Sequence, residues 1–274
     1  MLTLIDLGAE FWRNYFGSKS AVVAYELTLE HVDWFRRDCP RTVVCCDSPK
    51  SVRKEWFEGY KSNRPPKPKE AVDALVAVQR RIASWGVPVV LCDGYEGDDV
   101  LATLTGQAWI EEVRIIGSEK DLFALIAPNV RLMGRTGPIG ANECMEKFGV
   151  EPAQMTDWIA LVGDATDAIP GCPNCGPGRA SDLLTRFGSI AGIQAATDED
   201  ILSISGIGKT TLGSLRAWDP ELALRLVRLI DDVPVSLGEL FGGSEFPDYV
   251  ETDAETDAAP SAPEANDTRG DAAE

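Results

Sequence analysis

The sequence contains a single histidine, His31, among its 274 residues. One histidine excludes a His-rich metal site, and it argues against a Ser-His-Asp hydrolase, which needs that side chain as its base. Basic residues are also scarce, because 26 lysines and arginines stand against 44 aspartates and glutamates, for a net charge of −18. Proteins that bind nucleic acid usually present a basic face, so this total by itself argues against a DNA partner.

Long apolar runs and a secretory signal are missing as well. No stretch approaches the ~20 apolar residues that a membrane helix requires, so we expect no membrane partner. The seven cysteines are an odd number and lie inside apolar runs, which indicates reduced intracellular thiols. Cys172 and Cys175 form a C-x-x-C, but no second pair or histidine lies at zinc spacing. We therefore expect these two thiols to pack in the core.

The charge is unevenly spread along a chain that is otherwise ordinary in composition. Hydrophobic residues make up 44% of the sequence, and its length is typical of one or two domains. Residues 244–274 hold ten of the acids and one base, Arg269, without periodic apolar positions. Such a segment buries too little surface to offset its ordering entropy, so we predict a disordered acidic tail there. About half of the net negative charge then lies outside the fold.

Strand-like and helical patterns alternate in the first half of the chain. Helical patterns at Lys69–Trp85 and Val100–Trp109 separate short, nearly continuous apolar runs. Parallel strands that are covered on both faces have this character, so we predict an α/β fold with a parallel sheet. The four runs are Leu2–Ile5, Thr42–Cys46, Val87–Cys92 and Val113–Ile116.

Carboxylates follow each of these four predicted strands. Since the carboxyl ends of parallel strands meet at one edge of the sheet, these side chains should converge there. They could simply cap helix N-termini, as Asp and Glu often do. A group of this size, however, needs cations to offset its mutual repulsion, and oxygen ligands favour Mg²⁺ or Mn²⁺. The seven residues are Asp6, Asp47, Glu96, Asp98, Asp99, Glu119 and Asp121.

A second acidic motif precedes two glycine-rich turns. The segment Trp158–Asp167 has an apolar helical pattern ending in Asp164 and Asp167, which would share one helix face. Glycine-rich turns follow at 169–180 and 205–209, each leading into a helical pattern. A glycine turn at a helix N-terminus exposes backbone N–H groups that suit phosphate, although such turns also serve as plain connectors. Two of them indicate a helix-hairpin-helix grip on a nucleic-acid backbone.

The segment Lys50–Lys69 is the local exception to the negative charge. Its bases outnumber its acids, and Trp56, Phe57 and Tyr60 lie among them. Interleaved cations and rings suit single-stranded nucleic acid, because rings stack on bases and cations neutralise phosphates. Lys61 and Arg64 would lie on one face if the segment is helical. A solvated basic loop is the alternative.

Together these motifs resemble those of the 5′-nuclease (flap endonuclease) family, in the form found at the N-terminus of bacterial DNA polymerase I and in stand-alone phage or bacterial 5′–3′ exonucleases. They occur in the family's order and extend over residues 2–238. The matching segments are Leu4–Leu7 with Arg13, Cys46–Pro49, Glu58–Pro68, Gly94–Val100, Glu119–Leu122 and Gly163–Gly171.

The resemblance implies a Rossmann-like (PIN-like) nuclease domain over residues 1–150, with a helical arch at about 50–70 that threads a 5′ single strand. It implies an α-helical helix-hairpin-helix DNA-binding domain over 151–243, before the acidic tail. It also implies a cytoplasmic setting, in a bacterial cell or a phage-infected host.

Site residues carry over motif by motif. The first metal's ligands would be Asp6, Asp47, Glu96, Asp98 and Asp99, and the second's Glu119, Asp121, Asp164 and Asp167. Lys61 and Arg64 match the catalytic arch residues at the scissile phosphate. The DNA-binding positions would be Arg13, Arg53, Tyr60, Gly176, Gly178, Arg179, Gly206, Gly208 and Lys209. Three departures are Glu119 in place of the usual Asp, Ala168 in place of Asn, and Asn174-Cys175-Gly176 in place of Gly-Val-Gly.

The expected activity is 5′–3′ DNA exonuclease or 5′-flap endonuclease cleavage, by a two-metal mechanism that releases 5′-phosphates. The cofactors would be two or more Mg²⁺ or Mn²⁺ ions, with K⁺ as a further candidate at the hairpins. Partners would be DNA with 5′ flaps, nicks or ends, with RNA primers and a DNA polymerase as further candidates, and the enzyme would act as a monomer. The rival interpretations are a PIN-type ribonuclease and a catalytically inactive DNA-binding protein.

Overall fold

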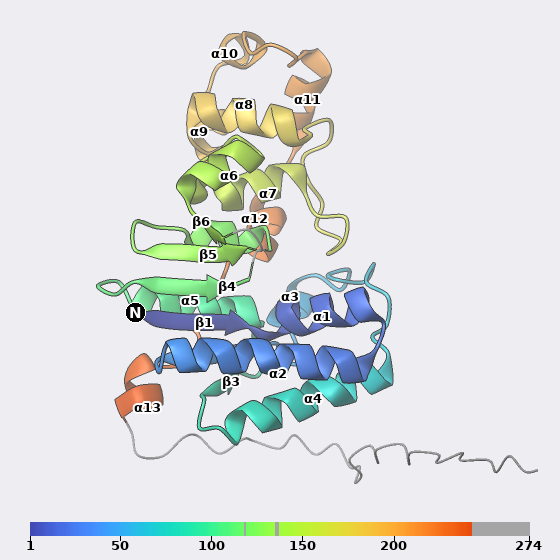
Figure 1. The fold of residues 1–274 in the computed structure, drawn as a ribbon. Helices are drawn as coiled ribbons and strands as arrows, with labels where there is room; N and C mark the ends of the chain where they lie inside the picture. The colour runs from blue at the N-terminus through green and yellow to red at the C-terminus, as the bar shows by residue number, and fades with distance from the viewer. Residues whose placement is uncertain (118, 135–136, 243–274) are drawn as a thin grey trace, which may run out of the picture. The chain divides into compact units, whose positions relative to one another are not determined.

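The computed structural model describes residues 1–242 except 118 and 135–136, so the predicted acidic tail lies outside the described residues. Within them, six strands form one sheet in the order β3-β2-β1-β4-β5-β6 (Figure 1). The first five run parallel, and β6 is antiparallel to β5. The strands are β1 (Leu2–Asp6), β2 (Thr42–Cys46), β3 (Val89–Leu91), β4 (Val113–Ile116), β5 (Val130–Gly134) and β6 (Gly137–Ile139).

The predicted α/β fold with a parallel sheet is confirmed. β2 and β4 have the predicted bounds, β1 extends one residue further to Asp6, and β3 is shorter than the run that predicts it. β5 and β6 have no counterpart among the predicted strands, because they lack a long apolar run. Pro138 lies in β6, where it is tolerated because this is the edge strand.

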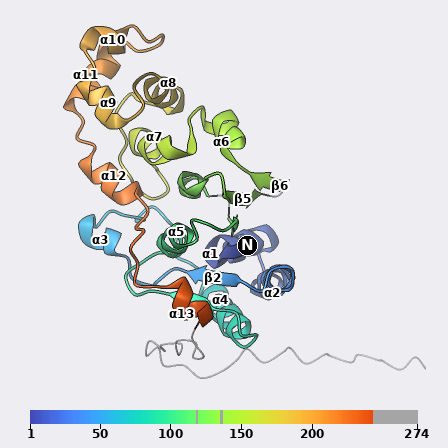
Figure 2. The ribbon, with the colours of Figure 1, turned by 90° about the vertical axis from the view of Figure 1, so that its left-hand side faces the viewer.

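Helices cover both faces of the sheet, as the continuous apolar strands predict. Val43 and Cys45 of β2 pack in a hydrophobic cluster with α5, while Val44 and Cys46 pack in a second cluster with α1, α2 and α4. Figure 2 shows α5 and α2 on opposite sides of the strands. The helices are α1 (Leu7–Ser18), α2 (Ala21–Asp38), α3 (Val52–Trp56), α4 (Lys69–Ala83), α5 (Gly97–Gln107) and the 3-10 helix η1 (Asp121–Leu125).

The second half of the chain is helical, and it shares its core with the sheet. One hydrophobic cluster contains Leu4 of β1, Leu161 of α7 and Leu226 of α12, and residues 1–243 form one compact unit. The division predicted at residue 150 stays a prediction. The elements are α6 (Ala141–Phe148), η2 (Pro152–Gln154), α7 (Met155–Val162), α8 (Pro177–Phe187), α9 (Ile190–Ala195), α10 (Asp198–Leu202), α11 (Lys209–Ala217), α12 (Glu221–Val227) and α13 (Leu237–Gly242).

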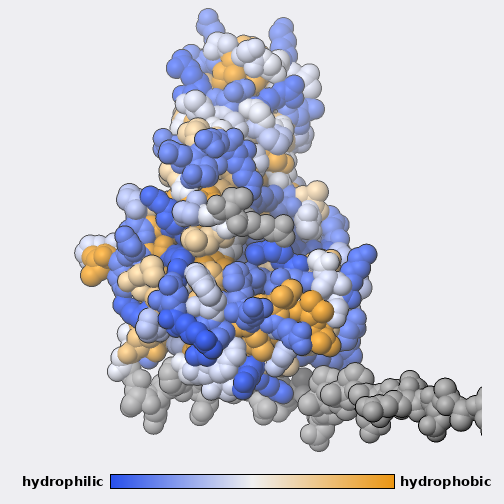
Figure 3. All heavy atoms as spheres, in the orientation of Figure 1, coloured by the Kyte–Doolittle hydropathy of each residue, from blue (hydrophilic) through white to orange (hydrophobic). Residues whose placement is uncertain are grey.

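The face of the molecule drawn in Figure 3 is mainly hydrophilic, with an apolar patch over α1 and α2. Phe16 and Val22 are exposed on either side of the turn that joins these helices. Cys172 and Cys175 are buried in the larger hydrophobic cluster, as predicted for thiols that pack in the core. Among the described residues, no helix combines the length and the apolar character that crossing a membrane would require.

Two of the strand-end acids also cap helices. The Asp6 side chain accepts a hydrogen bond from the Ala9 backbone N–H at 2.9 Å and so begins α1 directly after β1. The Glu96 backbone N–H donates to the Asp99 side chain at 3.1 Å, which fixes the first turn of α5. The helix-capping interpretation therefore holds for Asp6 and Asp99. The Asp99 cap lies in the first turn of α5, whose N-terminus is at the carboxyl edge of the sheet.

Candidate functional site

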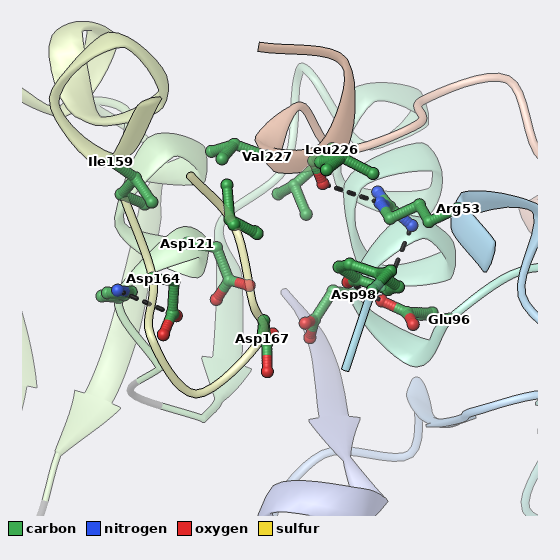
Figure 4. Close-up of a pocket in the computed structure, with 13 residues that line it drawn as sticks. Arg53, Glu96, Asp98, Asp121, Ile159, Asp164, Asp167, Leu226 and Val227 are labelled. Atoms are coloured by element: carbon green, nitrogen blue, oxygen red, sulfur yellow. Dashed lines mark hydrogen bonds and ion pairs between the residues drawn. The ribbon is translucent and has the colours of Figure 1, made fainter. Parts of the chain in front are cut away.

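Three carboxylates meet at the carboxyl edge of the sheet. Asp98, Glu119 and Asp121 each place an oxygen within 4.8 Å of the others. Asp98 lies in the first turn of α5, whereas Glu119 and Asp121 follow β4. Figure 4 shows Asp98 and Asp121 approaching one space from opposite sides. This space lies where the strand order reverses, between β1 and β4, which is where α/β sheets bind ligands.

Asp6 and Asp47 border the same edge from β1 and β2. Asp6 is buried at the end of β1, and Asp47 follows β2 and accepts a hydrogen bond from the Gly97 N–H at 2.9 Å. An oxygen of each lies 3.4 Å from the point that a Cβ on Gly8 would occupy, so the two carboxylates flank one position. The structure thus brings five of the predicted metal ligands to this edge.

The acids at this edge repel one another electrostatically. Burial and then the charges of Glu119 and Asp47 raise the pKa of Asp6 well above its ordinary value. Burial and then the charges of Asp121, Asp6 and Glu119 raise the pKa of Asp98 in the same way. The pKa values of Glu119 and Asp121 are also raised, chiefly by burial. We call these four residues the inner cluster; their shared shift means that a bound cation would stabilise them.

Glu96 lies beside the inner cluster but is paired with the arch segment. Lys61 Nζ donates to Glu96 at 2.7 Å, and the Tyr60 hydroxyl donates at 3.0 Å. Burial acts to raise the pKa of Glu96, yet the charges of Lys61 and Arg53 outweigh it and the pKa is lowered. Tyr60 is itself buried, so its ring is not available for the base stacking predicted for it.

The arch segment is less helical than predicted. α3 covers only Val52–Trp56, and residues 58–63 form turns in which Lys61 has a left-handed φ of 58°. Lys61 and Arg64 therefore do not share a helix face. They still point to the acidic edge, because Lys61 pairs with Glu96 and Arg64 Nε donates to Asp167 at 2.7 Å. A turn, and not a helix, thus places the two predicted catalytic cations at the site.

Asp164 and Asp167 lie on a loop and not on the helix that their spacing predicts. α7 ends at Val162 because Gly163 has a φ of 77°, and Asp164 then pairs through its backbone with Ile169. Lys120 Nζ forms an ion pair with Asp164 at 2.9 Å, and Asp167 is paired with Arg64. Figure 4 shows both acids along the loop that borders the pocket.

Asp99 and Arg53 are placed differently from the prediction. Asp99 is fully buried, and Arg53 is 2% exposed, so neither faces DNA or solvent. The guanidinium donates two hydrogen bonds of 2.7 Å to the Asp99 carboxylate. The structure does not bring Asp99 to the inner cluster, and we correct both assignments: its carboxylate is occupied by Arg53, and the Arg53 cation by Asp99.

Arg13 projects from α1 and donates to the buried carboxylate of Glu10 at 2.9 Å. His31 also contacts Glu10, at 2.8 Å. Burial acts to raise the pKa of Glu10, but the hydrogen bond and charge of His31, followed by the charge of Arg13, lower it. Arg13 remains half-buried, so one part of its guanidinium is held while the rest meets solvent.

The two glycine turns lie side by side, joined by Arg179. Its Nε donates to the Gly206 carbonyl at 3.0 Å and its Nη1 to the Asn174 carbonyl at 2.9 Å. Gly176 and Gly208 are the N-caps of α8 and α11, with Gly178 and Lys209 in the first turns. Asn174 has a φ of 60°, which asparagine tolerates in place of glycine. Arg179 therefore joins the two hairpins. The prediction gave it only a DNA-binding role.

Lys120 and the backbone of residues 226–230 belong to the site and are absent from the predicted site residues. Lys120 could have been found, because it lies between Glu119 and Asp121 in one of the matching segments. The carbonyls of Leu226 and Arg228 accept hydrogen bonds from Arg53. Backbone groups carry no side-chain pattern, so nothing in the sequence marks them.

Comparison with known proteins agrees with this architecture over residues 1–240. Residues 1–149 match the model of the 5′-3′ exonuclease N-terminal resolvase-like domain, and residues 150–240 match the 5′-3′ exonuclease C-terminal SAM fold. The 5′-3′ exonuclease of Streptomyces coelicolor is 31% identical over 265 residues, which cover 85% of this chain and 87% of that protein.

This chain is similar to only one part of the DNA polymerase I proteins that it matches. That of Deinococcus radiodurans is 32% identical over 261 residues, or 90% of this chain but 27% of the polymerase, and the match to the Rhizobium leguminosarum enzyme spans 19% of its length. A solved structure of the T5 5′-exonuclease with bound zinc has the same fold, with a TM-score of 0.68, 21% identity, and coverage of 84% of this chain and 89% of that one. The chain belongs to the 5′-3′ exonuclease family.

Proposed function

We propose that this protein is a divalent-metal-dependent 5′–3′ DNA exonuclease and 5′-flap endonuclease. The observation that carries the proposal is the juxtaposition of the inner cluster with the arch cations Lys61 and Arg64, which reach the same edge through Glu96 and Asp167. Acids that hold metal and cations that receive a phosphate are what phosphodiester hydrolysis requires. Family membership supports the direction of cleavage.

The residues present fit divalent metal ions. Asp98, Glu119 and Asp121 offer only oxygen ligands within 4.8 Å of one another, and burial raises their pKa values and that of Asp6, so a bound cation would stabilise the ionised carboxylates. Hard ligands of this kind favour Mg²⁺ or Mn²⁺. Bound there, two such ions would polarise the phosphate and supply a water of lowered pKa. Asp47 would complete the ligand set from β2.

The arch cations would bind and orient the scissile phosphate. Lys61 is held by Glu96 at 2.7 Å, and burial opposed by the Glu96 charge leaves its pKa raised, so it stays protonated. Arg64 lies on the outer side, with Asp167 as its partner. Two cations at one edge would stabilise the negative charge that develops on the phosphate oxygens.

The hairpins would grip the duplex away from the reacting phosphate. The turns before α8 and α11 lie together because Arg179 joins them, and the backbone N–H groups in the first turns of both helices would contact phosphates of the duplex. Contacts of this kind fix a duplex without reading its bases. The substrates would then be 5′ flaps, nicks and ends of DNA, with RNA primers as a further class, and the products 5′-phosphates.

The test is cleavage of a labelled 5′-flap duplex, with a nicked duplex and a matched RNA flap in parallel. We expect products mapped near the flap junction in Mg²⁺ or Mn²⁺, none in EDTA, and nicks that DNA ligase seals because they carry 5′-phosphates. Asp98→Asn is the control, since it should bind the flap but not cut it. A folded wild-type protein that leaves DNA intact in both metals refutes the proposal, and exclusive RNA cleavage would favour a PIN-type ribonuclease.

A further inference from the structure

A buried ion pair joins the arch segment to the helix that carries Asp98. Arg53 belongs to α3, and Asp99 lies in the first turn of α5. Both side chains are removed from solvent, with exposures of 2% and 0%. Two parallel hydrogen bonds of 2.7 Å link the guanidinium to the carboxylate. Such a bidentate pair fixes both distance and orientation, so α3 and α5 are held in one arrangement.

The pair also holds the chain that returns from the hairpins. Arg53 donates to the Leu226 carbonyl and the Arg228 carbonyl, both at 2.9 Å. The Ile230 N–H donates to Asp99 at 2.9 Å. Figure 4 shows Arg53 between the end of α12 and the acidic site. Three segments far apart in sequence therefore share one buried pair of charges.

Two more residues on α5 continue this contact at helical spacing. Thr103 lies one turn after Asp99, and its hydroxyl accepts a hydrogen bond from the Val233 N–H at 3.1 Å. Gln107 lies one turn further, donates to the Val235 carbonyl at 2.7 Å and accepts from the Leu237 N–H at 2.8 Å. The returning segment 226–237 thus runs along one polar stripe of α5.

The hydrogen bonds to Asp99 leave no room for a metal ion. One carboxylate oxygen accepts from Arg53 Nη2 and the Ile230 N–H, and the other accepts from Arg53 Nη1 and the Glu96 N–H. A carboxylate has about four lone-pair sites, and all four are engaged. Asp98, its neighbour in sequence, instead places a carboxylate oxygen within 4.8 Å of oxygens of Glu119 and Asp121.

We propose that Asp99 and Arg53 are positioning residues that set the register between the duplex grip and the site of cleavage. The inference rests on the proposed nuclease function. Lys61 lies on the chain after α3, Asp98 lies on α5, and the segment 226–237 follows the hairpin helices. Since one ion pair fixes all three, it determines which phosphodiester of a held duplex reaches the arch cations and the inner cluster.

The experiment compares Asp99→Asn and Arg53→Lys with Asp98→Asn, and uses Arg41→Lys as the matched control. Arg41 forms a partly buried ion pair with Glu111 at the amino ends of the strands, so it has the same Arg–carboxylate chemistry but lies away from the acidic edge. Mn²⁺ binding to each protein alone is measured from the electron paramagnetic resonance signal of free Mn²⁺. Hydrogen exchange reports on residues 226–237, and product mapping on a 5′-flap duplex gives the cleavage position, kcat and KM.

We expect Asp99→Asn and Arg53→Lys to bind Mn²⁺ like the wild type, whereas Asp98→Asn loses about tenfold or more. In both positioning variants exchange over 226–237 should rise, cleavage should spread to neighbouring phosphodiesters, and kcat should fall about 10–100-fold with little change in KM. Arg41→Lys should match the wild type throughout. Where a single variant does not fold, Arg53→Met with Asp99→Leu removes both charges together and is held to the same criteria.

Two results overturn the inference. Loss of Mn²⁺ affinity in Asp99→Asn as large as in Asp98→Asn would make Asp99 a ligand. Unchanged exchange over 226–237, or wild-type product positions in all positioning variants, would mean that the pair sets no register. A wild-type protein that does not cut DNA refutes the proposed function instead, and the Mn²⁺ and exchange measurements still decide whether Asp99 binds metal or anchors the returning segment.

Discussion

Two sets of carboxylates lie within the same acidic region, and they differ in what neutralises them. The inner cluster (Asp6, Asp98, Glu119 and Asp121) has raised pKa values because of burial, to which repulsion from other members of the cluster adds for Asp6, Asp98 and Glu119. The paired carboxylates each have a protein cation, as Glu96 has Lys61, Asp99 has Arg53, Asp164 has Lys120 and Asp167 has Arg64.

The difference separates two uses of the same side chain. A carboxylate with a fixed cation stabilises the fold or positions the arch, whereas one surrounded by other acids is ready for a metal ion. Asp98 and Asp99 show this most sharply, since they are adjacent in sequence and face different partners. Each of the following predictions tests this difference between the inner cluster and the paired carboxylates.

The largest effect is expected from breaking the buried pair. Asp99→Asn removes the bidentate partner of the buried Arg53 charge and leaves Glu96, 3.6 Å away, as its remaining carboxylate, so the free energy of unfolding should fall by about 3–5 kcal/mol. Asp98→Asn removes only repulsion and should leave stability unchanged or increased. Urea denaturation of both variants without metal gives the two values. Equal losses would erase the distinction between the two sets.

Metal should stabilise the protein through the inner cluster and Asp47, and not through the paired carboxylates. With Mg²⁺ at 100 times its Kd, the free energy of unfolding should rise by about 2.7 kcal/mol, because only the folded chain assembles the ligands. A tenfold or larger loss of affinity in Asp98→Asn should reduce this increase by about 1.3 kcal/mol or more, while the paired-carboxylate variant Asp164→Asn should keep most of it. Thermal melts across a Mg²⁺ titration measure the difference. An increase that is undiminished in Asp98→Asn would place the metal elsewhere.

The pH dependence of stability should have opposite signs for the two sets. Raised pKa values in the inner cluster favour the folded state below the ordinary value near 3.8 and lose that contribution as pH rises through the folded pKa. Glu96 has a lowered pKa, so its contribution exists above the ordinary value of 4.5 and is lost on acidification.

Thermal melts in EDTA from pH 4 to 8 should therefore show a free energy of unfolding that falls as the pH rises. The total fall should be smaller in Asp98→Asn than in the wild type, by about 1.4 kcal/mol for each unit of pKa shift that the substitution removes. Glu96→Gln should steepen the decline, since it removes the opposing term. Parallel plots of stability against pH for all three proteins would mean that the inner-cluster carboxylates do not destabilise the fold in the absence of metal.

The smallest effect is expected at the more exposed ion pair. Lys120 is 34% and Asp164 17% exposed, so Lys120→Met should change the free energy of unfolding by no more than about 1 kcal/mol. Its effect should shrink in high salt, unlike that of Asp99→Asn. Denaturation at low and high ionic strength tests this. A loss as large as that of the buried pair would show that Lys120 anchors the loop after α7.

Much of the site could be predicted from the sequence because it follows strand ends. Asp6, Asp47 and Asp98 come directly after apolar runs, or open the helix after one, and parallel strands must bring such positions to one edge. The predictions that assumed helical geometry from sequence spacing were wrong where the backbone is not helical. Gly163 ends α7 before Asp164, and the left-handed φ of Lys61 makes a turn where a helix was expected.

The sequence by itself determined four parallel strands, the acidic edge and the family, because apolar periodicity and short motifs are local properties of the chain. Only the tertiary structure decided which carboxylate meets which cation. Arg53 lies 46 residues from Asp99 and more than 170 from the Leu226 and Arg228 carbonyls that share it. Such contacts form when folding buries distant charges together, and a buried charge requires a partner that no local pattern specifies.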